Sequence, residues 1–324
     1  MKILVLGASG YIGKSLVAML RALSFEIVCA SRRRRATNDA HQQIYLDVQD
    51  KLMLEKALVG VDAVVNCVAG DADSIARGAS ALVDAALVSG MPRIIHLSTM
   101  AVYGRYEGVA DEETPFDPGL GWYARAKCKA EAQMKRYAEN KGAVVVLRPG
   151  CVYGPGSELW VGRVGRWLQS GRLGDLGAAG DGWSNLVHVD DVCAAIANSL
   201  SLALPSGGIR HFNLAAPDSP RWNVYFRDLA RAIGATPVQR LSIRRVKLDA
   251  LLFGPPLKLL EIFAKKAQLS TALISDPIPP ALLTVFSKQI LLDSSNAQSA
   301  LNIIWKPYRS ARSEFFSWFS ETRD

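Results

Sequence analysis

Tyr123 and Lys127 stand four residues apart, and this pair of side chains at this spacing suits acid–base chemistry. Positions i and i+4 lie on one face of an α-helix, so the phenol and the ammonium can reach one point. An ammonium beside a phenol favours the phenolate and lowers a pKa that is ordinarily about 10. We therefore expect Tyr123 to exchange a proton with a substrate near neutral pH. The competing interpretation is a chance pair on an amphipathic helix.

Thr99 is the third candidate in this part of the chain. It follows the apolar run 94–97, which predicts a strand, by two residues. If this strand packs against the helix of Tyr123, the threonine hydroxyl reaches the same substrate oxygen. The expected catalytic residues are thus Thr99, Tyr123 and Lys127, and the expected chemistry moves a proton on an alcohol or a carbonyl.

A glycine-rich segment near the N-terminus predicts a dinucleotide site. The apolar run 2–6 reads as a buried parallel strand, GASGYIG follows at 7–13, and a helical pattern comes next. The first glycine of such a motif permits a tight turn, the second lets a pyrophosphate approach the backbone, and the third allows close helix packing. The helix N-terminus adds amide donors. The expected cofactor contacts here are those of Gly7, Ser9, Gly10, Tyr11, Ile12 and Gly13.

The end of the second expected strand, 26–30, bears on which dinucleotide is bound. An NAD site places an acidic residue there for the ribose 2′-hydroxyl, whereas an arginine suits a 2′-phosphate. This chain has Ser31, Arg32 and Arg33. We therefore expect NADP as the preferred cofactor and NAD as the alternative, with these three residues near the ribose.

Two further strand ends are expected at the cofactor. A strand at 43–46 leads to Asp47 and Val48, where the carboxylate could bind the adenine amino group or could instead cap a helix at 51–58. A strand at 62–67 ends in three small residues that would let a cofactor lie across the edge of the sheet. These residues are Val68, Ala69 and Gly70.

The order of the elements predicts a doubly wound parallel α/β sheet, the Rossmann fold, with its ligands at the carboxyl ends of the strands. Further elements are expected as helices at 74–88 and 188–200, the latter with an acidic cap, and strands at 143–147 and 211–216. RPGCVYGPG at 148–156 reads as a loop that leaves the sheet. We expect a cofactor-binding domain at 1–150 with parts of 186–216, and a substrate-binding region at 151–185 and 217–324.

The composition is that of a globular protein and excludes several classes. The 324 residues are 49% hydrophobic and 21% charged. Five widely spaced cysteines without a Cys-x-x-Cys pair predict neither a metal site nor a disulfide framework, and they favour the cytoplasm. No run of apolar residues is long enough for a membrane span. The net charge of +8 is not accompanied by a nucleic-acid-binding module, so no nucleic-acid partner is expected.

The motifs together resemble those of an extended short-chain dehydrogenase/reductase of the NAD-dependent epimerase/dehydratase type. The resemblance runs from Met1 to about Trp318, and it rests on GASGYIG, LDV, LSTMAVYG, YARAK, RPGCVYGPG and VHVDDV. It implies that Tyr123 is the general acid/base, that Lys127 binds the nicotinamide ribose and lowers the pKa of the tyrosine, and that Thr99 orients the substrate oxygen. It further implies cofactor contacts by Pro149, Gly150 and Val152. Relatives often pair as homodimers through helices that correspond to 74–89 and 120–139.

Departures from the family pattern bear on the substrate. Sugar dehydratases of the family carry Asp-Glu after the catalytic threonine, where this chain has Met100 and Ala101. Nucleotide-sugar epimerases use an Asn and an Arg where this chain has Cys151 and Ser184. We therefore expect an oxidoreductase that interconverts a secondary alcohol and a ketone. The alternatives are a nucleotide-sugar epimerase or reductase with the same triad, and a non-catalytic member of the family.

The segment 248–267 is rich in Leu and Phe and carries lysines at one end. It resembles an apolar insertion of the 3β-hydroxysteroid dehydrogenases of the same group, which lies on or near a membrane. The competing interpretation is a pair of amphipathic helices that form a lid over the site. Both predict an apolar pocket, which suits a steroid-like or other apolar ketone better than a sugar nucleotide.

Overall fold

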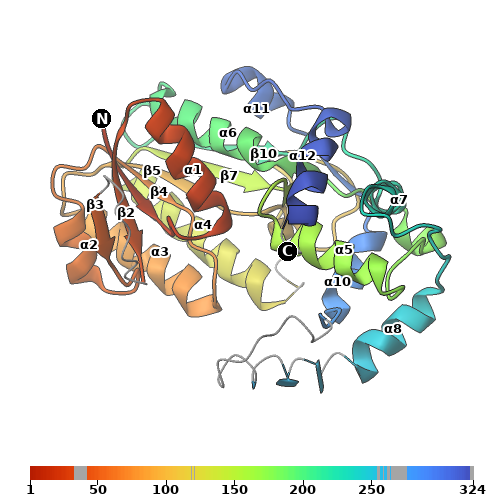
Figure 1. Ribbon diagram of the computed structural model, residues 1–324. Helices are drawn as coiled ribbons and strands as arrows, with labels where there is room; N and C mark the ends of the chain where they lie inside the picture. Colours follow the sequence, from red (N-terminus) through yellow and green to blue (C-terminus); the bar gives the residue numbers. More distant parts are fainter. Residues whose placement is uncertain are drawn as a thin grey trace. The chain divides into compact units, whose positions relative to one another are not determined.

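The computed structural model describes residues 1–32, 42–117, 119, 121–253, 256–257, 259–260, 263 and 276–321 (Figure 1). The chain divides into two compact units. The first comprises Met1–Gly150, Val187–Pro217 and Leu292–Trp305, and the second comprises Cys151–Leu186, Asp218–Leu291 and Lys306–Asp324.

A seven-stranded parallel sheet forms the first unit, in the order β10-β7-β5-β4-β1-β2-β3. This order confirms the predicted doubly wound α/β fold, because the chain reverses its direction of progress across the sheet after β3. The strands are β1 (Lys2–Leu6), β2 (Glu26–Ser31), β3 (Gln42–Tyr45), β4 (Ala63–Asn66), β5 (Arg93–Leu97), β7 (Val144–Pro149) and β10 (Ile209–Leu214).

Helices cover both faces of this sheet (Figure 1). On one face α3 packs between α2 and α4, and on the other α1 packs against α6. The helices of the first unit are α1 (Tyr11–Ala22), α2 (Lys51–Ala57), α3 (Ala72–Ala86), α4 (Trp122–Glu139), α6 (Val189–Ser201) and α11 (Ser295–Ala300). A 3₁₀ turn, η1 (Met100–Tyr103), and a short strand, β6 (Gly108–Ala110), follow β5.

The core explains why these strands read as continuous apolar runs. A parallel sheet is covered on both faces, so successive residues of one strand are all buried. Leu4 and Leu6 of β1 pack with Val64, Ile94 and other apolar residues of the neighbouring strands and helices. A rigid sheet of this kind fixes the loops at the carboxyl ends of its strands.

The second unit is built mainly from helices around an aromatic core. Trp222 lies at its centre, with ring centroids 5.0 Å from Phe286 and 5.8 Å from Phe226. Its elements are β8 (Cys151–Tyr153), η3 (Glu158–Arg163), α5 (Val164–Gln169), η4 (Gly177–Gly180), α7 (Trp222–Ala232), α8 (Ile243–Leu252), α10 (Pro280–Ser287) and α12 (Tyr308–Glu321). The strands β9 (Leu186–His188) and β11 (Ile290–Leu292) lie where the chain passes from the second unit to the first.

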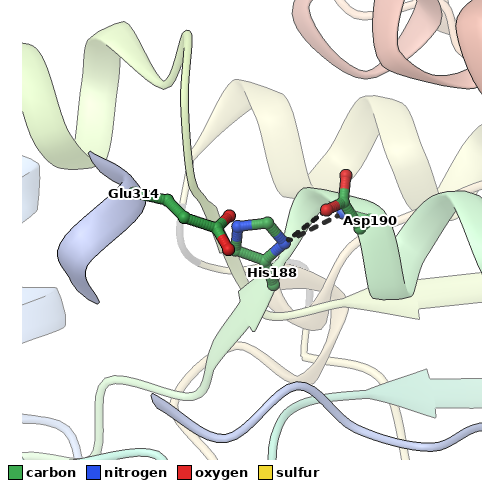
Figure 2. A group of neighbouring side chains, drawn as sticks. All are labelled: His188, Asp190 and Glu314. Carbon is green, nitrogen blue, oxygen red and sulfur yellow. Dashed lines mark hydrogen bonds and ion pairs between the residues drawn. The ribbon is translucent and has the colours of Figure 1, made fainter. Parts of the chain in front are cut away.

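Two local expectations are wrong. The segment 148–156 is not all loop, because β7 continues to Pro149 and β8 follows at once, with all three of its residues buried. The cap of α6 is not acidic: His188 precedes the helix, and its Nδ1 accepts from the backbone N–H of Asp190 at 3.3 Å (Figure 2). An imidazole nitrogen here takes the place that an aspartate oxygen usually fills.

The apolar segment 248–267 begins within α8, and most of its later residues lie outside the described residues. Within α8, Val246 and Ala250 are buried, whereas Leu251 and Leu252 are 62% and 64% exposed. None of the described helices is both long and apolar enough to cross a membrane.

Candidate active site

The carboxyl ends of the strands bring the expected site residues of the first unit to one edge of the sheet. The glycine-rich loop follows β1, Ser31 ends β2, and Thr99 comes two residues after β5. The remaining strand ends contribute Asp47 and Val48 after β3, Val68, Ala69 and Gly70 after β4, and Pro149 and Gly150 at β7. Ligands of doubly wound sheets bind at this edge.

The glycine-rich loop has the backbone geometry that a dinucleotide needs. Gly7 has φ +79°, a left-handed conformation that favours glycine. A Cβ on Gly13 would lie 2.2 Å from the carbonyl oxygen of Gly7, so only glycine lets the helix come this close to the strand. A Cβ on Gly10 would project toward the same carbonyl at 3.2 Å. The loop is therefore closely packed at the helix and free of side chains where a phosphate would approach.

The first turn of α1 adds hydrogen-bond donors to this loop. Its N-cap is Gly10, and within the described part of the chain no side chain caps it. The amide groups at the start of a helix point outward and carry partial positive charge. Ser9, Tyr11 and Ile12 lie in or beside this turn. The arrangement fits the pyrophosphate of a dinucleotide.

Lys127 is a buried amine one helical turn after Tyr123 on α4. It is 2% exposed, and its Nζ donates to the carbonyl oxygens of Leu97 at 2.6 Å and Val68 at 3.1 Å. Burial lowers the pKa of Lys127 to about 8, and the interactions with Cys67 and Glu131 oppose this shift. The ammonium thus connects the ends of β4 and β5 to the helix that carries Tyr123.

Tyr123 and Thr99 lie close together, as the sequence predicted. The Thr99 hydroxyl acts on the phenol and lowers its pKa. Thr99 Oγ1 accepts from the backbone N–H of Ala101 at 3.2 Å. Burial raises the pKa of Tyr123, and the effect of Thr99 offsets this only in part. We expected Lys127 to lower the pKa of Tyr123; instead it is raised, and the ammonium is bonded to backbone carbonyls.

Neutral groups surround the Lys127 ammonium on the strand side. Burial raises the pKa of the Cys67 thiol to about 12, and burial together with the charge of Lys127 keeps the pKa of His96 well below its usual value. The amide of Asn66 fixes the imidazole, because its Nδ2 lies 3.2 Å from Nδ1 of His96. Oδ1 of Asn66 accepts from the backbone N–H of Val68 at 3.1 Å. The turn that follows β4 is therefore rigid.

Arg32 follows β2 and lies beside the start of α3. Its Nη1 donates to Ser74 Oγ at 3.5 Å, and its charge acts on the carboxylate of Asp71, the N-cap of that helix. A Cβ on Gly70 would lie 3.8 Å from Nη2 of Arg32. The guanidinium therefore borders the strand end of Gly70. Arg33 lies outside the described residues.

Asp47 does not cap a helix. The N-cap of α2 is Asp50, whose side chain accepts from the backbone N–H of Met53 at 3.0 Å, while Asp47 accepts from Gln49. Val48 is buried, and a Cβ on Gly78 of α3 would lie 2.9 Å from its Cγ2. Asp47 thus keeps a carboxylate at the strand end. Val152 lies in β8, in the second unit.

A buried polar network beneath these residues was missed by the sequence analysis. Glu131 of α4 and Arg148 of β7 form an ion pair at 2.8 Å with both side chains 3% exposed. A signal was present: Tyr123, Lys127 and Glu131 recur at intervals of four on one helix face, and Arg148 interrupts an otherwise apolar strand.

The chain is similar to proteins of one family. The model of the NAD dependent epimerase/dehydratase family matches residues 3–215. Protein YeeZ of Escherichia coli K12 is 28% identical over 253 residues, 74% of this chain and 86% of the relative. A 3-diazoavenalumate denitrifying reductase of Streptomyces sp is 29% identical over 264 residues, 74% of this chain and 84% of the relative.

The fold also matches solved structures. MoeE5 in complex with UDP-glucose and NAD superimposes with a TM-score of 0.74 at 22% identity and covers 100% of both chains. At this identity the likeness concerns the fold. Because the family match spans residues 3–215 and thus more than half of the chain, the protein belongs to the NAD-dependent epimerase/dehydratase family of enzymes.

Proposed function

We propose that this enzyme is an oxidoreductase that interconverts a secondary alcohol and a ketone, with Thr99, Tyr123 and Lys127 as its catalytic residues. The observation that carries the proposal is the phenol of Tyr123, whose pKa the hydroxyl of Thr99 lowers and which lies one helical turn before the buried amine of Lys127. The amine of Lys127 donates to Leu97 O at the carboxyl end of β5, and Thr99 follows that residue by two. A ketone oxygen at this point would meet two hydroxyl donors.

The protonation states favour Tyr123 as the acid of a reduction. A pKa raised by burial leaves the phenol neutral at pH 7, so it can give its proton to a carbonyl oxygen. When bound, the nicotinamide cofactor supplies the hydride, which goes to the carbonyl carbon. The proton from Tyr123 completes the alcohol, and Thr99 and the Lys127 ammonium stabilise the phenolate that remains.

We propose NADP as the preferred cofactor. Arg32 borders the end of β4 and the start of α3, and at the end of β2 this chain has Ser31 where an NAD-specific site has an acid. An arginine and the lack of a carboxylate favour a 2′-phosphate over a free 2′-hydroxyl. We place the adenine beside Asp47, because this carboxylate follows β3 and does not cap α2.

The residues at two family positions support an apolar ketone as the substrate. Met100 and Ala101 replace the Asp-Glu of the dehydratases, so the groups that eliminate water are missing at these described positions. Ser184 is fully buried and engaged with Ser219 and Pro220 of its own unit, so it does not offer a charge to a diphosphate.

A nucleotide-sugar epimerase or reductase is the second candidate. It is favoured by the full-length likeness to MoeE5, which binds UDP-glucose and NAD. The same triad would serve it, because epimerisation and reduction both move a proton at a carbinol oxygen. The two candidates differ in whether external NADPH is consumed.

Cofactor consumption and ligand stabilisation test the proposal together. Purified protein is mixed with NADPH and a panel of steroid and alicyclic ketones, and loss of the reduced cofactor is followed by absorbance. Turnover of at least one ketone supports the proposal. If no ketone consumes NADPH while UDP-sugars raise the Tm of a protein that carries tightly bound cofactor, the epimerase candidate replaces it.

We also propose a reducing compartment, because none of the five cysteines, all of them among the described residues, forms a disulfide.

For the segment 248–267 we favour a lid over contact with a membrane surface. The exposed leucines of α8 and the exposed Arg244 and Arg245 are the features that a membrane contact would use. Sedimentation with anionic vesicles, lost in Leu251→Glu/Leu252→Glu, would support the contact. Failure to sediment would favour the lid interpretation.

A further inference from the structure

Glu131, Arg148 and Ser98 form a buried polar cluster directly beneath the candidate catalytic residues. These three residues are 4%, 3% and 4% exposed, in that order. The Glu131 carboxylate accepts from the hydroxyl of Ser98, and it also accepts from Arg148 Nε at 3.2 Å and Nη2 at 2.8 Å. Buried charges of this kind are costly to desolvate. None of the three touches the reacting atoms that the proposed function requires.

The cluster connects the elements that carry the catalytic residues. Glu131 lies one helical turn after Lys127 on α4, and Ser98 is the neighbour of Thr99 at the end of β5. The backbone N–H of Ser98 donates to Leu147 O at 2.7 Å, next to Arg148 on β7. One carboxylate therefore joins the helix of Tyr123 to the strand end of Thr99.

Arg148 extends the same cluster to the turn after Thr99. Its Nη1 donates to the hydroxyl of Tyr103 at 3.0 Å and to the backbone oxygen of Glu112 at 2.9 Å. Tyr103 ends the 3₁₀ turn that Thr99 begins, and its hydroxyl donates to Asn213 Oδ1 of β10 at 2.6 Å. Thr99 is thus held from both sides, through Ser98 before it and Tyr103 after it.

Glu131 also lies one helical turn from Lys127, and its charge raises the pKa of that amine. The described titratable groups that act on or adjoin the amine are Cys67 of the β4 end, His96 of β5, and Tyr123 and Glu131 of α4. The thiol and the phenol have raised pKa values, and the imidazole has a lowered one, so these three are neutral at pH 7. Glu131 is then the carboxylate that offsets the burial of the ammonium.

We propose that Glu131 is a positioning residue that fixes the strand end of Thr99 through Ser98 and places a carboxylate one helical turn from the amine of Lys127. The proposal rests on the proposed function, since it gives Thr99 and Lys127 their roles. A carboxylate fits both tasks, because one oxygen accepts from the serine while its charge acts on the amine a turn away. A purely structural ion pair would perform neither.

The charge of Lys127 can be measured without turnover. Protein carrying lysine labelled with ¹³C at Cε is titrated by NMR, and the resonance of Lys127 is identified by its loss in Lys127→Met. We expect Glu131→Gln to lower the pKa of Lys127 by about one unit, as loss of a nearby opposite charge does. Glu139→Gln, on the exposed end of the same helix, removes the same charge far from the amine and should leave the pKa unchanged.

A second variant guards against misfolding. Glu131→Gln leaves Arg148 buried without its partner, whereas Glu131→Gln/Arg148→Met removes both charges, a replacement that buried ion pairs often tolerate. In the double variant the pKa of Lys127 should fall by less than in Glu131→Gln, because the positive charge of Arg148 is lost together with the carboxylate. A pKa that stays at the wild-type value in Glu131→Gln, or in the double variant where only that one folds, overturns the proposal.

Turnover tests the link to Thr99. We expect Ser98→Ala to lower kcat about tenfold, within the range of a mispositioned catalytic group, with the cofactor KM and the pKa of Lys127 unchanged. A kcat equal to that of the wild type would overturn this part. The two proposals remain distinguishable: if Tyr123→Phe keeps its activity, the proposed function fails, while the NMR titration still decides whether Glu131 raises the pKa of Lys127.

Discussion

At the scale of single residues, Tyr123 is the group whose loss should be most specific. Tyr123→Phe removes one oxygen from a partly buried ring and leaves the cofactor loop intact. General acid catalysis by a positioned side chain contributes about 10²–10⁴-fold, so we expect kcat to fall by this factor. Cofactor affinity, measured by fluorescence titration, should change little. Activity within about tenfold of the wild type would show that another group supplies the proton.

Lys127 makes a prediction about stability that does not depend on the substrate. Burial lowers its pKa from 10.5 to about 8, so between these values the unfolded chain binds more protons than the folded one. Stability therefore rises with pH across this window. The shift of about 2.5 units corresponds to about 3 kcal/mol.

A difference measurement isolates this effect from other groups that titrate at alkaline pH. Denaturant unfolding of the wild type and of Lys127→Met is compared between pH 7.5 and 10.5. The free energy of unfolding of the wild type should rise relative to that of the variant by up to about 3 kcal/mol. A constant difference would mean that the amine keeps an ordinary pKa in the folded protein.

At the scale of the elements, the glycine-rich turn between β1 and α1 is the part least tolerant of change. A Cβ at Gly13 would overlap the backbone oxygen of Gly7, and backbone atoms cannot move aside as a flexible side chain does. Gly13→Ala should therefore push α1 away from β1 and weaken binding of the dinucleotide, measured by calorimetry. Gly90→Ala is the control variant in the binding assay, because a Cβ at Gly90 meets no atom. The positive φ of Gly90 means that this variant also loses some stability. Unimpaired binding by Gly13→Ala would exclude this placement of the pyrophosphate.

The sheet was predictable because its strands are continuous apolar runs that alternate with helices. The segment 148–156 was not, since its glycines and prolines suggested a loop while the three apolar residues of β8 between them are buried. Asp47 was ambiguous because a second aspartate, Asp50, stands within reach of the same helix end. The burial of β8 depends on the rest of the fold. The cap of α2 depended on which of two nearby aspartates reaches the helix end.

The candidate site divides in the same way. Thr99, Tyr123 and Lys127 could be named from spacing, because one strand end and one helix face are local patterns. The raised pKa of Tyr123 could not, since it follows from burial by the rest of the fold. Glu131 escaped notice because a glutamate on a helix is usually exposed, and only its contacts with Ser98 and Arg148 show that it is buried.

At the scale of the whole molecule, cofactor preference should be visible as stability. A ligand that binds only the folded chain stabilises it by about 2.7 kcal/mol at a hundred times its Kd. If Arg32 binds a 2′-phosphate, NADPH should raise the Tm more than NADH at equal concentration. Arg32→Ala should weaken NADPH binding about tenfold, or by about 1.4 kcal/mol, and leave NADH binding nearly unchanged.

Arg77 supplies the matched control for this measurement. It is an exposed arginine of α3, and its described ion pair is with Asp73 on its own helix, so Arg77→Ala removes an equal charge. Both variants change the net charge of +8 by the same amount, and a general electrostatic attraction for a phosphate would affect them alike. A loss confined to Arg32→Ala and to NADPH would assign the preference to this residue. Equal losses for both cofactors would mean that Arg32 does not distinguish a 2′-phosphate from a 2′-hydroxyl, and no loss for either would mean that it faces solvent.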